Sequence, residues 1–239
     1  MKLLDLTLAS PEENLALDEA LLEQAESLQS DDDVLRLWES QQTAVIIGRS
    51  SRIDEEVDIA ACASAQVPVL RRCSGGTSVV IGRGCLMYSV VLSYERNPAL
   101  RMVDVAHKYV LGKVVNAVKQ FLPSAELQGI SDLALNNLKF SGNSLRCKRD
   151  HLLYHGTLLC EFPLDLIVRY LKSPPRQPDY RGQRGHGEFV TNLGLDCADL
   201  RAAMADQWQS DAVLGVWPEA LTAELVGQRY SQTTWHHRL

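Results

Sequence analysis

The chain has 239 residues, a formal net charge of −6 and a hydrophobic fraction of 46%. This size and apolar content can bury one substantial core, which favours a single globular domain. The acidic balance excludes an overall positive field that attracts nucleic acid or an anionic membrane surface, so any basic site is expected to be local. No apolar stretch approaches the roughly 18 residues of a membrane span, and no signal sequence is evident. We therefore expect a cytoplasmic protein that binds neither nucleic acid nor membrane.

The first half of the chain alternates between helical and strand patterns. Apolar side chains recur at helical spacing over residues 14–28, and two β-rich runs follow at 34–40 and 43–48. A second helical pattern covers 54–66 and a short strand is predicted at 67–72. The predicted order is helix, strand, strand, helix, strand.

The second half begins with a β-rich apolar run at 85–94 and a helical pattern at 103–122. The Asn-Asn pair at 136–137 lies between two apolar runs and predicts a hairpin. The remaining segments are predicted as a strand at 151–162 and helices at 165–171, 191–208 and 220–230. The absence of repeats and linkers predicts one α+β domain over residues 1–239, with a mixed or antiparallel sheet flanked by helices.

Six cysteines are scattered through the chain without a C-x-x-C pair. In a reducing compartment this pattern argues against a disulfide framework and against a zinc site. We expect most of them to be reduced. They are Cys62, Cys73, Cys85, Cys147, Cys160 and Cys197.

The stretch RRCSGGTSVV, residues 71–80, places arginines and a Ser-Gly-Gly turn next to a predicted strand. Glycines let successive backbone N–H groups converge on an anion, and Arg71 or Arg72 can add a planar fork of donors. The alternative is a plain β-turn with arginines at a sheet edge. The stretch is neither a Walker loop nor a dinucleotide fingerprint, because the spacing of both motifs is missing.

A second stretch, LKFSGNSLR, carries Lys139 in an apolar strand before a predicted Ser-Gly-Asn turn. Such a lysine points either to solvent or into a cleft. If it points into a cleft, the two Ser-Gly turns line one anion pocket from two sides.

Four segments, in order, resemble the lipoate-protein ligase and octanoyltransferase family, which shares its fold with biotin-protein ligase. The segments are ENLALDEALL, LRLWESQQTAVIIGRSSRIDEEVD, RRCSGGTSVVIGRGCLMYSVVL and SDLALNNLKFSGNSLRCKRDHLLYHGTLL. The resemblance covers nearly the whole chain. It implies the α+β catalytic domain of the biotin and lipoate ligases, which is class II synthetase-like.

The resemblance implies a site for an acyl-adenylate, with ATP and Mg²⁺ as cofactors and lipoate as the acyl substrate. Lys139 would be the catalytic residue, in contact with the adenylate phosphate and the acyl carbonyl. Asp132 would lie near the metal, although an exposed loop aspartate is an equally good turn-former. The implied cofactor-binding residues are Arg72, Ser74, Gly75, Gly76, Thr77, Ser78, Val79, Val80, Asn143, His155, Gly156 and Thr157.

Several positions depart from the family pattern. Ile81 stands where many members have histidine, Thr77 replaces the third glycine, and Gly84-Cys85 replaces a Gly-Asn pair. In YHGTLL the first histidine of the family motif is Tyr154. A threonine keeps its N–H but narrows the turn, so these changes put the nucleotide geometry in question.

The implied activity is ATP-dependent activation of lipoate to lipoyl-AMP and transfer of the lipoyl group to a lysine of a lipoyl domain. The partners would be lipoyl domains of 2-oxo acid dehydrogenase E2 subunits or the glycine cleavage H protein. Many such ligases carry a C-terminal accessory domain for which no segment remains here, so a small accessory subunit is one possible partner. Biotin ligase is disfavoured because no G-R-G-R-x-x-x-W segment is found.

Two alternatives stay open from the sequence. An octanoyltransferase would need a nucleophilic cysteine, and Cys147, between two cations, is the best candidate. A binding protein without chemistry would hold lipoate or a lipoyl domain. The arginine-rich loop at 175–189 is read either as solvated chain or as a cover over the nucleotide that also meets the acceptor.

Overall fold

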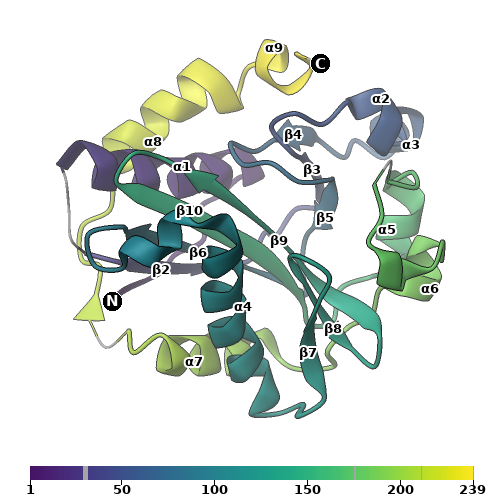
Figure 1. The fold of residues 1–239 in the computed structure, drawn as a ribbon. Helices are drawn as coiled ribbons and strands as arrows, with labels where there is room; N and C mark the ends of the chain where they lie inside the picture. The colour runs from purple at the N-terminus through teal and green to yellow at the C-terminus, as the bar shows by residue number, and fades with distance from the viewer. Residues whose placement is uncertain (29–31, 175, 211, 239) are drawn as a thin grey trace.

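The computed structural model describes residues 1–28, 32–174, 176–210 and 212–238, and the strands in these ranges form two sheets (Figure 1). The strands of the larger sheet are β1 (Lys2–Asp5), β2 (Val34–Trp38), β6 (Cys85–Ser93), β7 (Ala125–Gln128), β8 (Asp132–Leu135), β9 (Leu138–Cys147), β10 (His151–Leu159) and β11 (Ala212–Val213). Their order is β11-β1-β2-β6-β10-β9-β8-β7. The smaller sheet has the order β4-β3-β5 and consists of β3 (Ala44–Ile47), β4 (Val69–Arg71) and β5 (Val79–Ile81).

Both sheets are mixed. In the larger sheet β1 pairs in parallel with β2 and β11, whereas the pairs from β2 to β7 are antiparallel. In the smaller sheet β3 is parallel to β4 and antiparallel to β5. The predicted α+β fold with a mixed sheet is confirmed.

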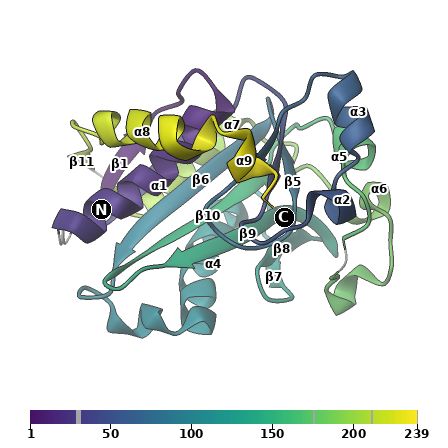
Figure 2. The same cartoon turned by 90° about the horizontal axis from the view of Figure 1, so that it is seen from above.

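Helices cover both faces of the larger sheet. The helices in the described residues are α1 (Pro11–Leu28), α2 (Ile53–Glu56), α3 (Ile59–Ser64), α4 (Val103–Lys119), α5 (Asp165–Tyr170), α6 (His186–Phe189), α7 (Cys197–Gln207), α8 (Glu219–Leu225) and α9 (Thr233–His236). Helices α1 and α8 pack together on one face, and α4 and α7 pack together on the other (Figure 1). Seen from above, α2, α3, α5 and α6 gather at one end beside the smaller sheet (Figure 2). None of these helices has the length and apolar content to cross a membrane.

The start of α1 is fixed by its sequence. The Glu13 N–H donates to the Ser10 hydroxyl at 3.2 Å, and the Ser10 N–H donates to the Glu13 carboxylate at 2.9 Å. This reciprocal pair is a capping box, and Pro11 occupies the first helical position, where its missing N–H costs nothing. The predicted helix at 14–28 is confirmed and begins at Pro11.

The centre of the larger sheet is built from β6 and β10, whose residues are all buried. Apolar runs of this kind form strands covered on both faces. Next to them, the hairpin predicted at Asn136 and Asn137 joins β8 to β9, and both asparagines have positive φ, at 50° and 64°. Asparagine tolerates this conformation, which two-residue hairpins require.

Two predicted helices are wrong in extent. The pattern at 54–66 forms two short helices, because Asp58 accepts a hydrogen bond from the Ala61 N–H and so starts a second helix. The pattern at 191–208 is helical only from Cys197, because the Gly194 backbone has φ +66° and its N–H is bonded to the carbonyl of Cys160.

Candidate functional site

A glycine-rich loop joins β4 to β5 and is shaped by the buried side chain of Arg72. Its guanidinium donates hydrogen bonds to the carbonyl oxygens of Ile46 at 3.2 Å and Thr77 at 3.0 Å. It also donates to the carbonyl of Gly75 and to the hydroxyl of Ser74 at 3.1 Å. Burial lowers the pKa of Arg72 to about 10, so the guanidinium stays charged at neutral pH. Arg72 therefore holds the loop in shape from the inside.

Two glycines let the loop lie against the turn that follows β3. A Cβ on Gly48 would lie 1.9 Å from the carbonyl oxygen of Gly76, and Gly76 itself has φ +85°. Residues with a side chain seldom adopt this φ. At Gly75, by contrast, a Cβ would have no atom within 4 Å. The backbone therefore requires glycine at 48 and 76 but not at 75.

The β8–β9 hairpin brings Lys139 to Asp132. The Lys139 Nζ lies 2.7 Å from the Oδ1 of Asp132, and the Tyr180 hydroxyl donates to the Oδ2 at 2.9 Å. Gly142 faces Asp132 across the ladder, and a Cβ there would lie 3.2 Å from the Lys139 Nζ. Glycine thus leaves room for the lysine tip. Asp132 is a buried residue at the start of β8, and the alternative of an exposed turn-former is wrong.

Asn143 of β9 and Gly156 of β10 are cross-strand partners. The Asn143 amide donates to the carbonyl of Ser131 at 2.8 Å, and its Oδ1 accepts a hydrogen bond from the Tyr88 hydroxyl. A Cβ on Gly156 would lie 1.8 Å from that Oδ1. Gly156 therefore provides the space in which the Asn143 side chain is held. The predicted Ser-Gly-Asn turn is wrong, because these residues lie inside the continuous strand β9.

A buried polar chain connects α1 with the glycine-rich loop. Asp18 accepts hydrogen bonds from Arg36 at 2.5 Å and from Ser89 at 2.8 Å. The Nδ1 of His155 lies 3.5 Å from the Oδ2 of Asp18, and its Nε2 is bonded to the Ser74 hydroxyl. Burial opposes ionisation of Asp18, but Arg36, the nearby His155 and the hydrogen bond from Ser89 hold the pKa of Asp18 below its ordinary value. Asp18 is therefore a carboxylate that faces His155.

Two cavities meet at Lys139. The larger has a volume of about 410 Å³ and the smaller about 80 Å³. The residues that line both are Thr77, Val79, Lys139, Gly142 and Thr157. The larger cavity is lined further by the apolar side chains of Leu15, Ile46 and Met87, and by Arg72, Gly76, Asp132, Asn143, His155 and Gly156. A cation between two largely apolar spaces suits a ligand with an anionic group at its middle.

The smaller cavity lies between β5 and the chain after α5. β5 is an edge strand of its sheet, and Ser78, Val79 and Val80 line the cavity beside the aromatic ring of Phe189. The carboxylate of Glu56 accepts hydrogen bonds from the Ser78 N–H and the Ser78 hydroxyl, each at 2.7 Å. Sequence analysis does not single out Glu56, which lies in the acidic run at residues 54–56.

Most predicted site residues reach the cavities, but two do not. Ser74 and Gly75 line neither cavity. The Ser74 hydroxyl is bonded to His155, and the Gly75 carbonyl accepts hydrogen bonds from Arg72 and from the Ser144 hydroxyl. Both residues therefore contribute to the shape of the loop.

Residues from 172–174 and 176–190, here called the cover, line parts of both cavities, and the reading of the arginine-rich loop as a cover over the nucleotide stays a prediction. Arg176 lines the larger cavity, and Arg181, His186 and Phe189 line the smaller. The Arg181 guanidinium lies over the Phe189 ring, 4.7 Å from its centroid, and only 3% of Arg181 is exposed. The reading as solvated chain is wrong for Arg181.

Cys147 lies at the opposite end of β9 from Lys139 and is exposed. At about 3.3 Å per residue, the strand separates the two Cα atoms by roughly 26 Å. Within the described residues, no cysteine lines either cavity. The same residues contain no group of three or more His, Cys, Asp or Glu arranged to hold a metal ion. A metal ion bound by Asp132 would therefore take further ligands from the oxygens of a bound substrate.

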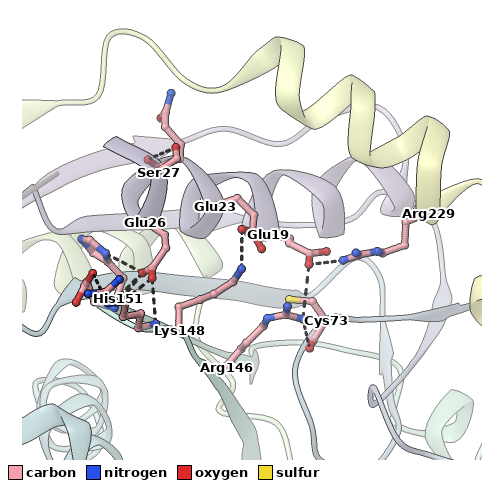
Figure 3. A network of polar contacts seen from close by, with 12 residues as sticks. Glu19, Glu23, Glu26, Ser27, Cys73, Arg146, Lys148, His151 and Arg229 are labelled. Carbon is pink, nitrogen blue, oxygen red and sulfur yellow. Dashed lines mark hydrogen bonds and ion pairs between the residues drawn. The ribbon is translucent and has the colours of Figure 1, made fainter. Parts of the chain in front are cut away.

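Glu19 on α1 connects three parts of the chain around the loop (Figure 3). Its carboxylate forms an ion pair with Arg229 and accepts a hydrogen bond from the Tyr230 hydroxyl at 2.7 Å, both from the π-helical turn Val226–Tyr230. Arg146 of β9 lies 3.6 Å from the same carboxylate and donates to the carbonyl of Cys73 at 3.1 Å. The start of the loop is thus tied to α1 and to the turn after α8.

The base of the loop is tied to α9 through Arg71. The Arg71 guanidinium donates to the carbonyls of Gly48 at 2.8 Å, Ser51 at 2.7 Å and His236 at 2.8 Å. The Arg71 N–H donates to the Nδ1 of His236 at 2.9 Å, and the Trp235 indole donates to the Arg71 carbonyl at 2.8 Å. No motif in the sequence signals this role for α9.

Sequence comparison gives relatives that are named as lipoate-protein ligases. The chain is 30% identical over 160 residues to the probable lipoate-protein ligase A of Mycoplasma genitalium, which covers 67% of this chain and 46% of the relative. It is 26% identical over 226 residues to the lipoate-protein ligase A of Blochmanniella floridana, covering 88% of this chain and 63% of the relative. The chain thus spans about half to two thirds of the length of these relatives.

Solved structures share the fold. A lipoate-protein ligase A bound with ATP superposes with a TM-score of 0.82 at 24% identity, covering 99% of this chain and 98% of that one. The bi-partite lipoate protein ligase from Thermoplasma acidophilum, described with its E2 lipoyl domain, also gives a TM-score of 0.82 at 24% identity, over 100% of this chain and 96% of that one. Residues 10–207 match the family model of the lipoyl protein ligase A/B catalytic domain. The chain therefore belongs to the lipoyl protein ligase A/B catalytic-domain family.

Proposed function

We propose that this chain, residues 1–239, is the catalytic domain of an ATP-dependent lipoate-protein ligase. The observation that carries the proposal is Lys139, whose ammonium lies at the junction of two cavities with Asp132 as its partner at 2.7 Å. A fixed cation in a partly desolvated cleft favours reactions in which negative charge develops beside it. The names of the relatives support the same activity.

In the first step, an oxygen of the lipoate carboxylate attacks the α-phosphorus of ATP and pyrophosphate leaves, which gives lipoyl-AMP. In the second, the amine of an acceptor lysine attacks the acyl carbonyl and AMP leaves. The Lys139 ammonium neutralises charge on the phosphate and on the acyl oxygen in both steps. The adjoining cavities would also hold lipoate and ATP next to each other, which lowers the entropic part of the barrier.

The linings of the two cavities support a place for each half of the adenylate. The apolar side chains of Leu15, Ile46 and Met87 suit the acyl chain of lipoate in the larger cavity. The edge of β5 offers backbone hydrogen-bonding groups to a purine, and Phe189 offers a ring face beside it in the smaller cavity. Arg72 binds the carbonyl of Thr77, and Thr77 lines both cavities where they meet.

Asp132 fits a shared magnesium site. Mg²⁺ is commonly held by one or two carboxylates together with phosphate oxygens, and Asp132 supplies a cavity carboxylate next to Lys139. When bound there, the ion would neutralise charge on the triphosphate. Tyr180 and Lys139 hold the two oxygens of Asp132 until then.

The octanoyltransferase reading has less support. Thioester exchange needs a thiolate at the acyl carbonyl. Cys147 is at the far end of β9, and within the described ranges neither cavity has a cysteine in its wall. The reading as a binding protein without chemistry requires no such group, so it needs a direct measurement of lipoyl transfer.

The partners proposed for this chain are lipoyl domains of 2-oxo acid dehydrogenase E2 subunits or the glycine cleavage H protein, in the cytoplasm. A small accessory subunit is proposed as a further partner for the adenylation step, because the lipoate protein ligase of Thermoplasma acidophilum, which has the same fold, is described as bi-partite. The proposal does not need this subunit for the transfer step.

Mass spectrometry of a purified lipoyl domain tests the function. One reaction contains the protein with lipoate, ATP and Mg²⁺, a second contains preformed lipoyl-AMP without ATP, and a third contains octanoyl-carrier protein without ATP. Lipoylation in the first or second reaction, lost in Lys139→Ala, supports the ligase. Gain only in the third shows a transferase, and gain in none of them, with lipoyl-AMP still bound, shows a binding protein.

A further inference from the structure

The cover over the cavities is one excursion of the chain that leaves and returns at neighbouring points. The chain leaves the larger sheet after β10 at Cys160 and reaches α7 at Cys197, the first residue of that helix. Between these residues lie α5 and α6, which Figures 1 and 2 both show together beside the smaller sheet. The excursion contributes Ile167, Leu171 and Phe189 to the smaller cavity.

Hydrogen bonds already join the two ends of the excursion. The Leu193 N–H donates to the carbonyl of Leu159 at 2.8 Å, and the Gly194 N–H donates to the carbonyl of Cys160 at 3.0 Å. The amide of Asn192 donates to the carbonyl of Phe162 at 2.8 Å. These contacts fix the backbone on both sides, so the two cysteines face each other without any movement of the chain.

The two thiols are in contact. The Sγ of Cys197 lies 2.7 Å from the Sγ of Cys160, so a bond between them needs only a small movement of the side chains. Both are free thiols. Cys160 is 1% exposed, whereas Cys197 is half-buried and accessible to a small oxidant.

We propose that Cys160 and Cys197 form a redox-modification site that closes to a reversible disulfide when the protein meets a peroxide. Hydrogen peroxide oxidises the Cys197 thiol to a sulfenic acid and is reduced to one water. The Cys160 thiol then attacks the sulfenic sulfur, forming the S–S bond and releasing a second water. Two thiols and one peroxide thus give one disulfide and two waters, and a dithiol such as dithiothreitol reverses the reaction by exchange.

The disulfide fastens the cover at its base. It closes a covalent loop that contains the whole excursion from α5 to α6, and Leu159, adjacent to Cys160, lines the smaller cavity. A cross-link of this kind reduces the freedom of the opened chain more than that of the folded one. Opening of the cover is therefore expected to be rarer in the oxidised protein.

Intact-mass measurement tests the site without reference to activity. Wild type and the control variant Cys147→Ser, in which only the exposed Cys147 is replaced, are treated with one equivalent of hydrogen peroxide. Peptide mapping under non-reducing conditions follows. The expected result is a mass loss of two hydrogens, recovered by dithiothreitol, with the peptides of Cys160 and Cys197 joined. Cys197→Ser and Cys160→Ser should each lose this change, and having both variants guards against one that fails to fold.

Limited proteolysis then tests the effect on the cover. Cleavage within residues 176–188 should slow by about fivefold in the oxidised wild type, and Tm should rise by several degrees, as expected for a cross-link in a chain of this size. Thiols that stay reduced under peroxide, or a disulfide that forms through a different cysteine, would overturn the proposal. Unchanged proteolysis with the disulfide formed would overturn its role at the cover.

Discussion

The two Ser-Gly segments at the candidate site look alike in sequence but are built differently. Ser74, Gly75 and Gly76 lie in an irregular loop, whose carbonyls are held by side chains such as Arg72. Ser141, Gly142 and Asn143 lie inside β9, where the ladder with β10 holds the backbone. The strand ladder positions Lys139 through the backbone, whereas the loop depends on side chains that bind its carbonyls. The same residue types thus occur in one wall that is held by backbone hydrogen bonds and in another that is held by side-chain hydrogen bonds.

Replacing Lys139 by alanine should have the largest effect, because it removes the cation from the strand wall. We expect lipoyl transfer to fall by about 10³-fold, the order seen when one charge-stabilising donor is removed from an active site. The measurement is the rate of lipoylation from preformed lipoyl-AMP. Lys148→Ala, at the far end of the strand and paired with Glu23 at 2.7 Å, is the matched control and should keep its activity.

Gly156→Ala tests how rigid the strand wall is. The new Cβ would lie 1.8 Å from the Asn143 Oδ1 and 2.9 Å from a ring carbon of Tyr88, in a strand whose residues are all buried. Overpacking of this kind is expected to lower the free energy of unfolding by about 3 kcal/mol. Denaturant unfolding measures it. A loss below about 1 kcal/mol would show that β9 can move away from β10.

The pH dependence of stability tests how α9 holds the loop. Burial lowers the pKa of His236, whose neutral Nδ1 accepts a hydrogen bond from the Arg71 N–H. As the pH falls, His236 becomes protonated at a higher pH in the unfolded chain than in the folded protein. The contribution of neutral His236 to the free energy of unfolding is therefore complete above about pH 6.5 and is lost as the pH falls below that value.

The variant His236→Ala isolates this contribution. At pH 8 it should be about 1 kcal/mol less stable than wild type, and the difference should shrink toward pH 5. Because His107 and His186 are present in both chains, their titration cancels in the difference. A difference that grows on acidification would mean that His236 is protonated in the folded protein.

Gly75→Ala should have the smallest effect. Its Cβ position has no atom within 4 Å, so the free energy of unfolding should change by less than about 0.5 kcal/mol. Gly76→Ala is the contrast, because its φ is +85° and a Cβ would lie 2.8 Å from the Arg72 Nη2. Equal losses in the two variants, measured by thermal unfolding, would show that the loop relaxes around position 76.

Periodicity and turn chemistry predicted the fold well where the chain interacts with itself locally. The hairpin at Asn136 and Asn137 follows from two residues that tolerate positive φ. The helix predicted at 191–208 failed at Gly194, whose N–H is used by Cys160, a partner remote in sequence. The short strands β1 and β11 went unnoticed because they carry too few residues for an alternation to show.

For the candidate site, too, the residues in contiguous motifs were predicted and those contributed by distant segments were not. The family resemblance pointed to Lys139 and to the glycine-rich loop, because their motifs are contiguous in the chain. Glu56, Tyr180 and the contacts of α9 came only from the structure, since each reaches the site from a distant segment. Ser74 and Gly75 belong to the motif yet line no cavity, so a motif position is not evidence of ligand contact.

The hydrogen bond between Arg71 and His236 joins residues 165 positions apart. During synthesis the chain emerges from its N-terminus, so β4 and the glycine-rich loop leave the ribosome long before α9 does. Trp235 and His236 cannot brace Arg71 until nearly the whole described chain has been made. The base of the glycine-rich loop is therefore completed later in synthesis than the strands β3 and β4 beside it.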